Sequence, residues 1–229
     1  MPLDSPRRSA LSDQVIEALR TQITSGGWPV GERIPTEPEL VEQLGVARNT
    51  VREAVRALAH NGLLDIRQGS GTYVVATSEL AGVMQRRFSG AASQHVAELR
   101  SALEAEGARL AALRRTERDL GLLDQLLERR EEAWRSRVVE RFVEADATLH
   151  LAVVTASHNE VLTAVYADLG TVLREYLRHD VGEELRDEEH VDHARVVAAI
   201  RARDAEAAAR EAGSHAVSCR PSAPRAKAR

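Results

Sequence analysis

Asp146 and His150 are the two residues of this sequence whose types and spacing most clearly predict chemistry. They stand four positions apart in the apolar stretch RFVEADATLHLAVVTA, so on a helix their side chains lie on the same face. A carboxylate and an imidazole beside a hydrophobic core are costly to bury unless a partner satisfies them. The sequence leaves two arrangements open: the residues hydrogen-bond each other, or both bind a metal ion.

Two more histidines can complete a metal site. His193 and His215 are 22 positions apart, which on one continuous helix is a rise of about 33 Å and too far to share a metal. Asp204 has the residue type of a helix N-cap, so we expect the helix to break there and the chain to fold back as a hairpin. The two histidines then come level with each other. His190 competes with His193 for this role, because the two are expected three residues apart on one helix.

One aspartate and three histidines suit a divalent metal ion, with zinc as the first choice and nickel, manganese or iron as alternatives. A metal with an open coordination position could activate water in a hydrolase-like enzyme, could hold a small carboxylate, or could be purely structural. No positioned general base stands out beside the candidate ligands, so we do not expect an enzyme.

A helical body must position these residues. From 94 to 218 the sequence reads as six helices without strands, which predicts an antiparallel bundle. The fourth helix is expected to run unbroken through NEVLTAVYADLGTVLREYLRHD, after a capping box of Ser157 and Glu160. We expect residues 77–93 to link this body to an N-terminal domain, and the basic tail 219–229 to be disordered.

The N-terminal part, 11–76, has the pattern of a winged helix-turn-helix that follows a flexible stretch, 1–10. After a first amphipathic helix comes the short segment EPELVEQLG, for which Thr36 and Glu39 form a capping box. The longer segment ARNTVREAVRALAHNG follows at once, and two helices so close together indicate a helix-turn-helix. LLDIRQGSGTYVV then predicts a β-hairpin, the wing. The expected protein is therefore mainly α, with a winged helix-turn-helix and an antiparallel helical bundle.

The longer helix of this motif has the surface chemistry of a recognition helix. Its N-terminal end carries arginine, which can bond guanine through two N–H groups, and asparagine and threonine, which can bond adenine, thymine or phosphate. The wing adds an arginine and small residues that permit a close approach to DNA. The ordinary alternative is a solvated helix with surface arginines. The candidate DNA-binding residues are Arg48, Asn49, Thr50, Arg52, Arg67, Gly69, Ser70 and Gly71.

Composition limits the other classes of function. The net charge of -4 gives no overall attraction to nucleic acid, so DNA binding must come from a local basic patch. Cys219 is the single cysteine, so no intramolecular disulfide can form, and we expect a cytoplasmic protein. No apolar run approaches the roughly 20 residues that span a bilayer, so no membrane partner is expected.

Residues 11–75 resemble the DNA-binding domain of the GntR family of bacterial transcription regulators. The resemblance is carried by the helix VREAVRAL and the wing GSGTYV, and it implies DNA contacts from Arg48, from Arg52 and from the wing near Gly69. Many members have a phosphate-contacting arginine where this chain has Pro38, so we do not expect that contact here.

Residues 98–215 resemble the FCD (FadR C-terminal) effector domain of the same regulators, through LRSALEAEGARLAA, DATLH, SHNEVL and HARVVAAIRARDAEAA. The register of this resemblance selects His193 over His190. Arg100 matches an arginine that often lines the effector pocket, although with Glu104 it can form an ordinary i,i+4 pair. In the metal-containing members of the domain the ligands correspond to Asp146, His150, His193 and His215.

The resemblance therefore implies a ligand-responsive transcription regulator, expected to be a repressor that acts as a homodimer. Its other partners would be double-stranded operator DNA and a small organic acid effector. The metal ion and Arg100 would hold that effector within the helical bundle.

Overall fold

The computed structural model describes residues 11–217, apart from the side chains of Glu189 and of residues 215–217. The predictions of a flexible stretch at 1–10 and of a disordered tail at 219–229 lie outside the described residues.

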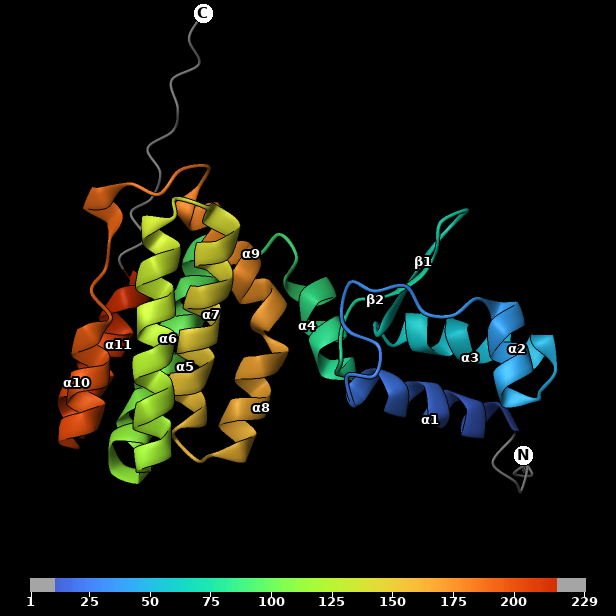
Figure 1. The fold of residues 1–229 in the computed structure, drawn as a ribbon, viewed down its shortest axis with the longest axis horizontal. Helices are drawn as coiled ribbons and strands as arrows, with labels where there is room; N and C mark the ends of the chain where they lie inside the picture. Colours follow the sequence, from blue (N-terminus) through green and yellow to red (C-terminus); the bar gives the residue numbers. More distant parts are fainter. Residues whose placement is uncertain (1–10, 218–229) are drawn as a thin grey trace, which may run out of the picture. The chain divides into compact units, whose positions relative to one another are not determined.

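Two compact units make up the chain, Met1–Arg87 and Phe88–Arg229. Both are mainly α-helical, as the sequence predicts (Figure 1). Three helices and a two-stranded antiparallel sheet form the winged helix-turn-helix of the first unit. These elements are α1 (Leu11–Thr24), α2 (Glu37–Leu44), α3 (Arg48–His60), β1 (Leu64–Arg67) and β2 (Gly71–Val74).

The helix-turn-helix is defined by the two ends of α2. Thr36 is the N-cap, and its backbone N–H donates to Glu39 Oε2 at 2.7 Å in the predicted capping box. Gly45 ends the helix with a φ of 65°, a left-handed conformation that glycine adopts without strain. The apolar faces of the three helices then pack with the hairpin into one core, formed by Val15, Leu19, Ile23, Ile34, Leu40, Val51, Ala54, Val55, Leu58, Leu63, Leu64 and Val74.

The wing is a tight hairpin. Its strands pair antiparallel, with Arg67 opposite Gly71. Gly69 and Gly71 have φ values of 76° and 128°, which L-residues with side chains rarely adopt. A side chain at Gly71 would also collide with Arg33, whose Nε lies 2.5 Å from the position of an added Cβ. The glycines therefore keep the tip narrow.

Helix α4 (Glu79–Phe88) lies within the segment 77–93 that the sequence predicts as a linker. Its Gly82 packs against the turn that follows α3, because a Cβ at Gly82 would lie only 2.3 Å from the carbonyl oxygen of Gly62. The segment is therefore partly helical and packs on the winged helix-turn-helix.

The second unit is a helical bundle, with no strand among its described residues. It has seven α-helices and a short 3₁₀ turn, where six helices were expected. None of the helices that the structure describes has the combined length and hydropathy of a membrane-spanning segment. The elements of this unit are α5 (Ser93–Arg114), α6 (Glu117–Arg135), α7 (Val139–Thr155), α8 (Glu160–Asp168), α9 (Gly170–Val181), the 3₁₀ turn η1 (Asp187–Glu189), α10 (Ala194–Ala202) and α11 (Ala205–Val217).

The additional helix arises because the segment predicted as one long helix is two, α8 and α9, which meet at Leu169 and Gly170. Glycine has a low helix propensity, which makes this the weakest point of the segment. The predicted capping box is also wrong. Asn159 rather than Ser157 caps α8, and its Oδ1 accepts a hydrogen bond from the Leu162 N–H at 3.1 Å. Ser157 Oγ accepts a hydrogen bond from the Asn159 N–H at 3.1 Å. Asn159 precedes the first residue of α8, so this bond does not cap the helix.

Helices α10 and α11 form the hairpin that the sequence predicts. Arg203 adopts a left-handed φ of 58° between them, and Asp204 caps α11 by accepting from a backbone N–H of its first turn at 2.9 Å. Helix α10, however, begins only at Ala194. The expectation that His190 and His193 share a helix is therefore wrong, because the 3₁₀ turn and an extended residue precede α10.

Candidate metal centre and nucleic-acid interface

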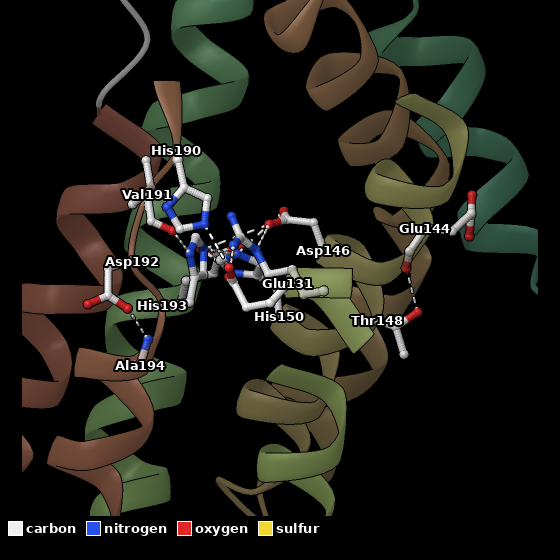
Figure 2. A network of polar contacts seen from close by, with 12 residues as sticks. Glu131, Glu144, Asp146, Thr148, His150, His190, Val191, Asp192, His193 and Ala194 are labelled. Atoms are coloured by element: carbon white, nitrogen blue, oxygen red, sulfur yellow. Dashed lines mark hydrogen bonds and ion pairs between the residues drawn. The ribbon is translucent and has the colours of Figure 1, made fainter. Parts of the chain in front are cut away.

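Three buried side chains bring metal-ligating atoms together inside the second unit. Asp146 and His150 lie one turn apart on α7, and His193 lies at the start of α10 (Figure 2). The Nε2 atoms of the two histidines are 2.9 Å apart. The Asp146 carboxylate lies 3.5 Å from His150 Nε2 and 3.7 Å from His193 Nε2. One donor atom from each of the three residues thus lies within 4.8 Å of the others.

The fourth expected ligand, His215, has a side chain that lies outside the described residues. Its backbone belongs to α11, which packs along α5. The Ser101 hydroxyl of α5 donates to the Gly213 carbonyl oxygen of α11 at 2.9 Å. Since Ser101 directly follows Arg100, the hairpin places this part of α11 beside the segment of α5 that borders the cluster.

The opposite nitrogen of each clustered histidine faces an oxygen. His150 Nδ1 lies 2.9 Å from Glu104 Oε2, at ion-pair distance although outside the alignment of a good hydrogen bond. His193 Nδ1 lies 2.8 Å from the Val191 carbonyl oxygen. Both contacts favour a proton on Nδ1, so Nε2 is the atom of each ring that faces the cluster and can ligate a metal ion. Burial lowers the pKa of His150, but the carboxylates of Glu104 and Asp146 outweigh burial and raise it. A proton can therefore bridge the two Nε2 atoms at 2.9 Å, and a cation placed between them and the Asp146 carboxylate would replace that proton.

Two buried arginines hold the Asp146 carboxylate. Arg130 Nε donates to Oδ1 at 2.7 Å, and Arg100 Nη2 donates to Oδ2 at 3.2 Å. Burial raises the pKa of Asp146, but His150 and the two arginines outweigh burial and hold that pKa well below its usual value. The carboxylate is therefore ionised and can ligate a metal. Sequence reasoning missed Arg130, because the charged run LERREEAW has the pattern of a solvated helix face.

A second buried carboxylate, Glu104, supports the cluster from α5. Arg100 Nε donates to its Oε1 at 2.7 Å, and the Tyr166 hydroxyl donates to the same oxygen at 2.5 Å. Burial raises the pKa of Glu104, yet the positive charges of Arg100 and His150 lower it to about 2. The i,i+4 pair of Arg100 and Glu104 is therefore present but is not an ordinary surface pair, since the two residues are 6% and 1% exposed.

His190 does not join the cluster. Its Nε2 lies 2.8 Å from Glu131 Oε2 (Figure 2). Its ring packs edge-on against Trp134. Glu131 in turn accepts from Arg130 Nη1 at 2.8 Å. His190 thus reaches the cluster only through two intervening side chains, and the geometry favours His193 as the ligand.

Arg100 also borders a small cavity beside the cluster. The cavity has a volume of about 80 Å³ and lies between α5, α7, α8 and α9. Arg100 and Arg174 contribute two positive charges to its wall, and most of the remaining lining is apolar. Asp146, His150 and His193 do not line it. The other lining residues are Ala147, Leu151, Tyr166, Ala167, Gly170, Leu173 and Leu177.

In the first unit, the expected base-reading residues lie together at the start of α3. Arg48 and Asn49 are exposed, and Thr50 and Arg52 are half-buried. Arg52 donates to the Glu37 carboxylate through Nε at 3.3 Å and Nη2 at 3.2 Å, and Arg48 donates through Nε at 3.4 Å. The sequence pattern did not identify Glu37 as a functional residue. In the sequence it is only an acidic residue in the first turn of a helix, where a negative charge is favourable.

The expected wing residues lie at the tip of the hairpin. Arg67 Nε donates to Asp65 Oδ2 at 2.9 Å, and its guanidinium lies 4.3 Å from the centre of the Tyr73 ring. The hydroxyls of Ser70 and Tyr73 hydrogen-bond at 2.8 Å, and Gly69 lies in the loop between the strands. These contacts keep the tip compact while its residues remain exposed.

A cleft connects the start of α3 with the wing. It has a volume of about 260 Å³ and is lined by Arg48 of α3, Glu37 of α2, and Gly71 and Thr72 of the wing. Arg33, whose side chain is exposed, lines it as well. Of the candidate DNA-binding residues, Arg48 of the helix and Gly71 of the wing border this cleft, and Arg33 and Arg48 give it two positive charges.

Two family profiles match this chain. The family described as "Bacterial regulatory proteins, gntR family" matches residues 11–74, and the family described as "FCD domain" matches residues 95–217. The second match alone spans more than half of the chain.

Curated relatives carry the names of operon regulators. The Uxu operon regulator of Haemophilus influenzae is 32% identical over 67% of this chain, and the match spans 57% of that protein, little more than half of its length. The galactonate operon transcriptional repressor of Escherichia coli strain K12 is 28% identical over 86% of this chain and 90% of its own length.

Solved structures share the fold. Streptococcus agalactiae GntR is similar with a TM-score of 0.53 and 28% sequence identity, over 90% of this chain and 97% of that chain. E. coli McbR/YncC is similar with a TM-score of 0.51 and 23% identity, over 92% of this chain and 95% of that chain.

The structure and the comparisons agree. The winged helix-turn-helix of the first unit coincides with the gntR match, and the helical bundle of the second unit coincides with the FCD match. The names of the relatives describe regulators of operons and not enzymes. The chain belongs to the gntR family of bacterial regulatory proteins, with an FCD domain as its second unit, and is a transcription regulator rather than an enzyme.

Proposed function

We propose that this regulator is a repressor whose second unit binds a divalent metal ion and a small carboxylate effector, and whose first unit binds double-stranded operator DNA. The observation that carries the proposal is the buried cluster of Asp146, His150 and His193 beside a cavity lined by Arg100. Because the same chain carries a winged helix-turn-helix, occupation of that site can be read out as DNA binding. Action on chromosomal DNA would place the protein in the cytoplasm.

The metal would be held by Asp146, His150 and His193, with His215 as the fourth ligand. Glu104 would orient the His150 ring from behind, as carboxylates commonly do for metal-bound imidazoles. Imidazole and carboxylate donors favour zinc first, with nickel, manganese or iron as alternatives. A bound divalent ion supplies a buried positive charge to which a carboxylate can bind.

The effector is expected to be small and acidic. Arg100 and Arg174 place two positive charges on the cavity wall, and leucine side chains supply apolar surface around them. A cavity of about 80 Å³ has room for only a few non-hydrogen atoms, so a compact carboxylate fits it better than a long-chain acid.

We further propose that the protein acts as a homodimer. A two-fold axis would present two recognition helices to the two halves of a palindromic operator. An effector that binds one arrangement of the dimer more tightly than another shifts the population toward it, and thereby changes operator affinity. Repression is supported by the name of the E. coli relative, a galactonate operon transcriptional repressor.

A second candidate is a purely structural metal without an effector. The observation that favours it is that Asp146, His150 and His193 are all buried and none of them lines the cavity. In that case the ion would stabilise the bundle by joining α7 to α10, and regulation would reside elsewhere.

A thermal-shift screen of small organic acids on the metal-loaded protein tests both candidates. The effector proposal expects compact acids to raise the melting temperature of the metal-loaded protein and to change its affinity for operator DNA. A metal that raises the melting temperature while no acid changes it supports the structural metal. Stabilisation by neutral or long-chain ligands alone would contradict a compact carboxylate effector.

A further inference from the structure

We propose that Glu37 is a positioning residue for DNA recognition, whose carboxylate fixes the guanidinium groups of Arg52 and Arg48 so that their remaining N–H groups read base edges. This inference rests on the proposed function, because it requires that α3 enters the major groove. Glu37 belongs to α2 and not to the recognition helix α3, so the inference extends DNA recognition to a second helix.

The Glu37 carboxylate contacts two arginines, Arg48 and Arg52. Arg52 Nε lies 3.3 Å from both Oε1 and Oε2 of Glu37, and Arg52 Nη2 lies 3.2 Å from Oε2. Arg48 Nε lies 3.4 Å from the same Oε2. The contacts use one edge of each guanidinium. Arg52 Nη1 and both terminal nitrogens of Arg48 take no part in them, and so remain available to another acceptor.

A guanidinium can hold a carboxylate with one edge and present the other edge to guanine. The planar fork fixes the direction of every N–H group once one edge is bound. An arginine without such a partner must lose rotamer freedom when it binds a base, and that loss weakens binding. Glu37 is 31% exposed at its side chain and Arg52 is 38% exposed, so the pair is shielded enough to be ordered but open enough to meet DNA.

The negative charge of Glu37 would also favour binding to the operator sequence over binding to other DNA. Its pKa is lowered, first of all by the hydrogen bond from Arg52, so the group is ionised at neutral pH. An anion beside the two arginines weakens their attraction to any phosphate backbone, which reduces binding to non-specific sequences. On the correct sequence the oriented arginines compensate through base contacts. Glu37 is therefore expected to raise specificity more than affinity.

The alternative is that Glu37 forms ordinary surface ion pairs and stabilises the N-terminus of α2. Such a role would affect folding stability a little, and it would change specific and non-specific DNA binding by the same factor. Glu42 provides a matched control. It lies on the same helix, is exposed, and forms no ion pair with any residue that the structure describes.

The experiment compares full-length wild type, Glu37→Gln and Glu42→Gln on two DNA duplexes. One duplex is selected from a random-sequence pool by the wild-type protein, and the other is its scrambled counterpart. We expect Glu37→Gln to lower the ratio of specific to non-specific affinity by about tenfold, with non-specific affinity unchanged or increased. Glu42→Gln should leave the ratio unchanged. Thermal melting of each variant confirms that the first unit remains folded.

A double-mutant cycle with Arg52→Ala separates positioning from a general charge effect. If Glu37 acts through Arg52, Glu37→Gln should change the specificity ratio much less in the Arg52→Ala background. An unchanged ratio in Glu37→Gln, an equal loss in Glu42→Gln, or an undiminished effect without Arg52 would each overturn the proposal. Failure of the proposed function would appear earlier and differently, as a wild-type protein that enriches no sequence from the pool.

Discussion

His150 and His193 face each other through Nε2 atoms 2.9 Å apart in a buried interior, although 43 residues separate them in the chain. One comes from the middle of α7 and the other from the residue just before α10. Each ring is held from behind by an oxygen, so neither can turn away without losing a contact. A ligand shared by the two rings would therefore join α7 to the hairpin of α10 and α11.

Metal content should depend on the clustered histidines and not on His190. His150→Ala and His193→Ala should each remove stoichiometric metal, and His215→Ala should do the same if that residue is the fourth ligand. His190→Ala should retain it, because His190 Nε2 faces Glu131 instead of the cluster. Elemental analysis of the four variants after dialysis measures this directly. Full metal in the His150 variant, or a loss confined to the His190 variant, would contradict the ligand set.

Removing the metal should destabilise the second unit in particular. A ligand present at about 100 times its dissociation constant stabilises the native state by about 2.7 kcal/mol. For a domain of this size such a loss lowers the melting temperature by about 10 °C. Calorimetry with and without a chelator should show the shift in the transition of the second unit, and re-addition of zinc should reverse it. A chelator that leaves both transitions in place would mean that the cluster of Asp146 and the histidines is satisfied without metal.

Arg130 should matter more when the metal is absent. Its Nε bonds Asp146 at 2.7 Å within the core, so Arg130→Met leaves a buried carboxylate with one arginine fewer. Loss of one partner from a buried ion pair costs about 3–5 kcal/mol. A bound divalent ion compensates part of the charge, so the metal-loaded variant should lose less stability than the metal-free variant.

Urea unfolding of both metal states measures the effect of Arg130→Met, and Arg129→Met is the control. Arg129 is exposed and adjacent on α6, so its replacement should change the unfolding free energy by less than about 0.5 kcal/mol. Equal losses in the two metal states of the Arg130 variant would show that the ion does not bind near Asp146.

Local sequence patterns accounted for much of this architecture. Thr36 and Glu39 form the predicted capping box, and Asp204 caps α11 where the hairpin was expected to close. These features could be predicted because the partners lie within three residues of each other along the chain. The family resemblance supplied what spacing alone left open, namely the preference for His193 over His190.

Tertiary relationships of charged residues could not be predicted in the same way. Arg130 and Glu37 both occur in stretches that read as solvated helix surface, yet each bonds a partner 15 or 16 positions away. Nothing in a charged run shows which member turns inward. The break at Gly170 was missed for a similar reason, because an isolated glycine in a helical pattern is often tolerated.

Arg174 should contribute to effector binding without affecting the metal. It lines the cavity, pairs with Glu144 at 3.0 Å and lies on α9, away from the cluster. Arg174→Gln should weaken binding of a compact acid by about tenfold or more, since a hydrogen bond to a charged group contributes about 1.5–3 kcal/mol. Isothermal titration with the acid identified by thermal shift measures the change.

The control for Arg174 is Arg178→Gln, one turn further along α9. Arg178 is exposed and does not line the cavity, so this variant should bind the acid as the wild type does. Metal content should be the same in both variants. If Arg178→Gln weakens binding as much as Arg174→Gln, the acid is attracted by the general charge of α9, and the cavity is not its site.

Specific DNA binding should depend on Arg48 and Arg52. Each lies at the start of α3 with N–H groups available beyond its contact with Glu37, and a lost base contact costs about 1–3 kcal/mol. Arg48→Ala and Arg52→Ala should therefore weaken binding to the selected duplex more than binding to scrambled DNA.

Fluorescence anisotropy over a range of salt concentrations separates base contacts from phosphate contacts, because loss of one phosphate contact lowers the salt slope by about 1. Arg118→Ala, which removes an exposed positive charge from α6, should change neither quantity. Unchanged affinity for the selected duplex in both α3 variants would remove the recognition role of this helix.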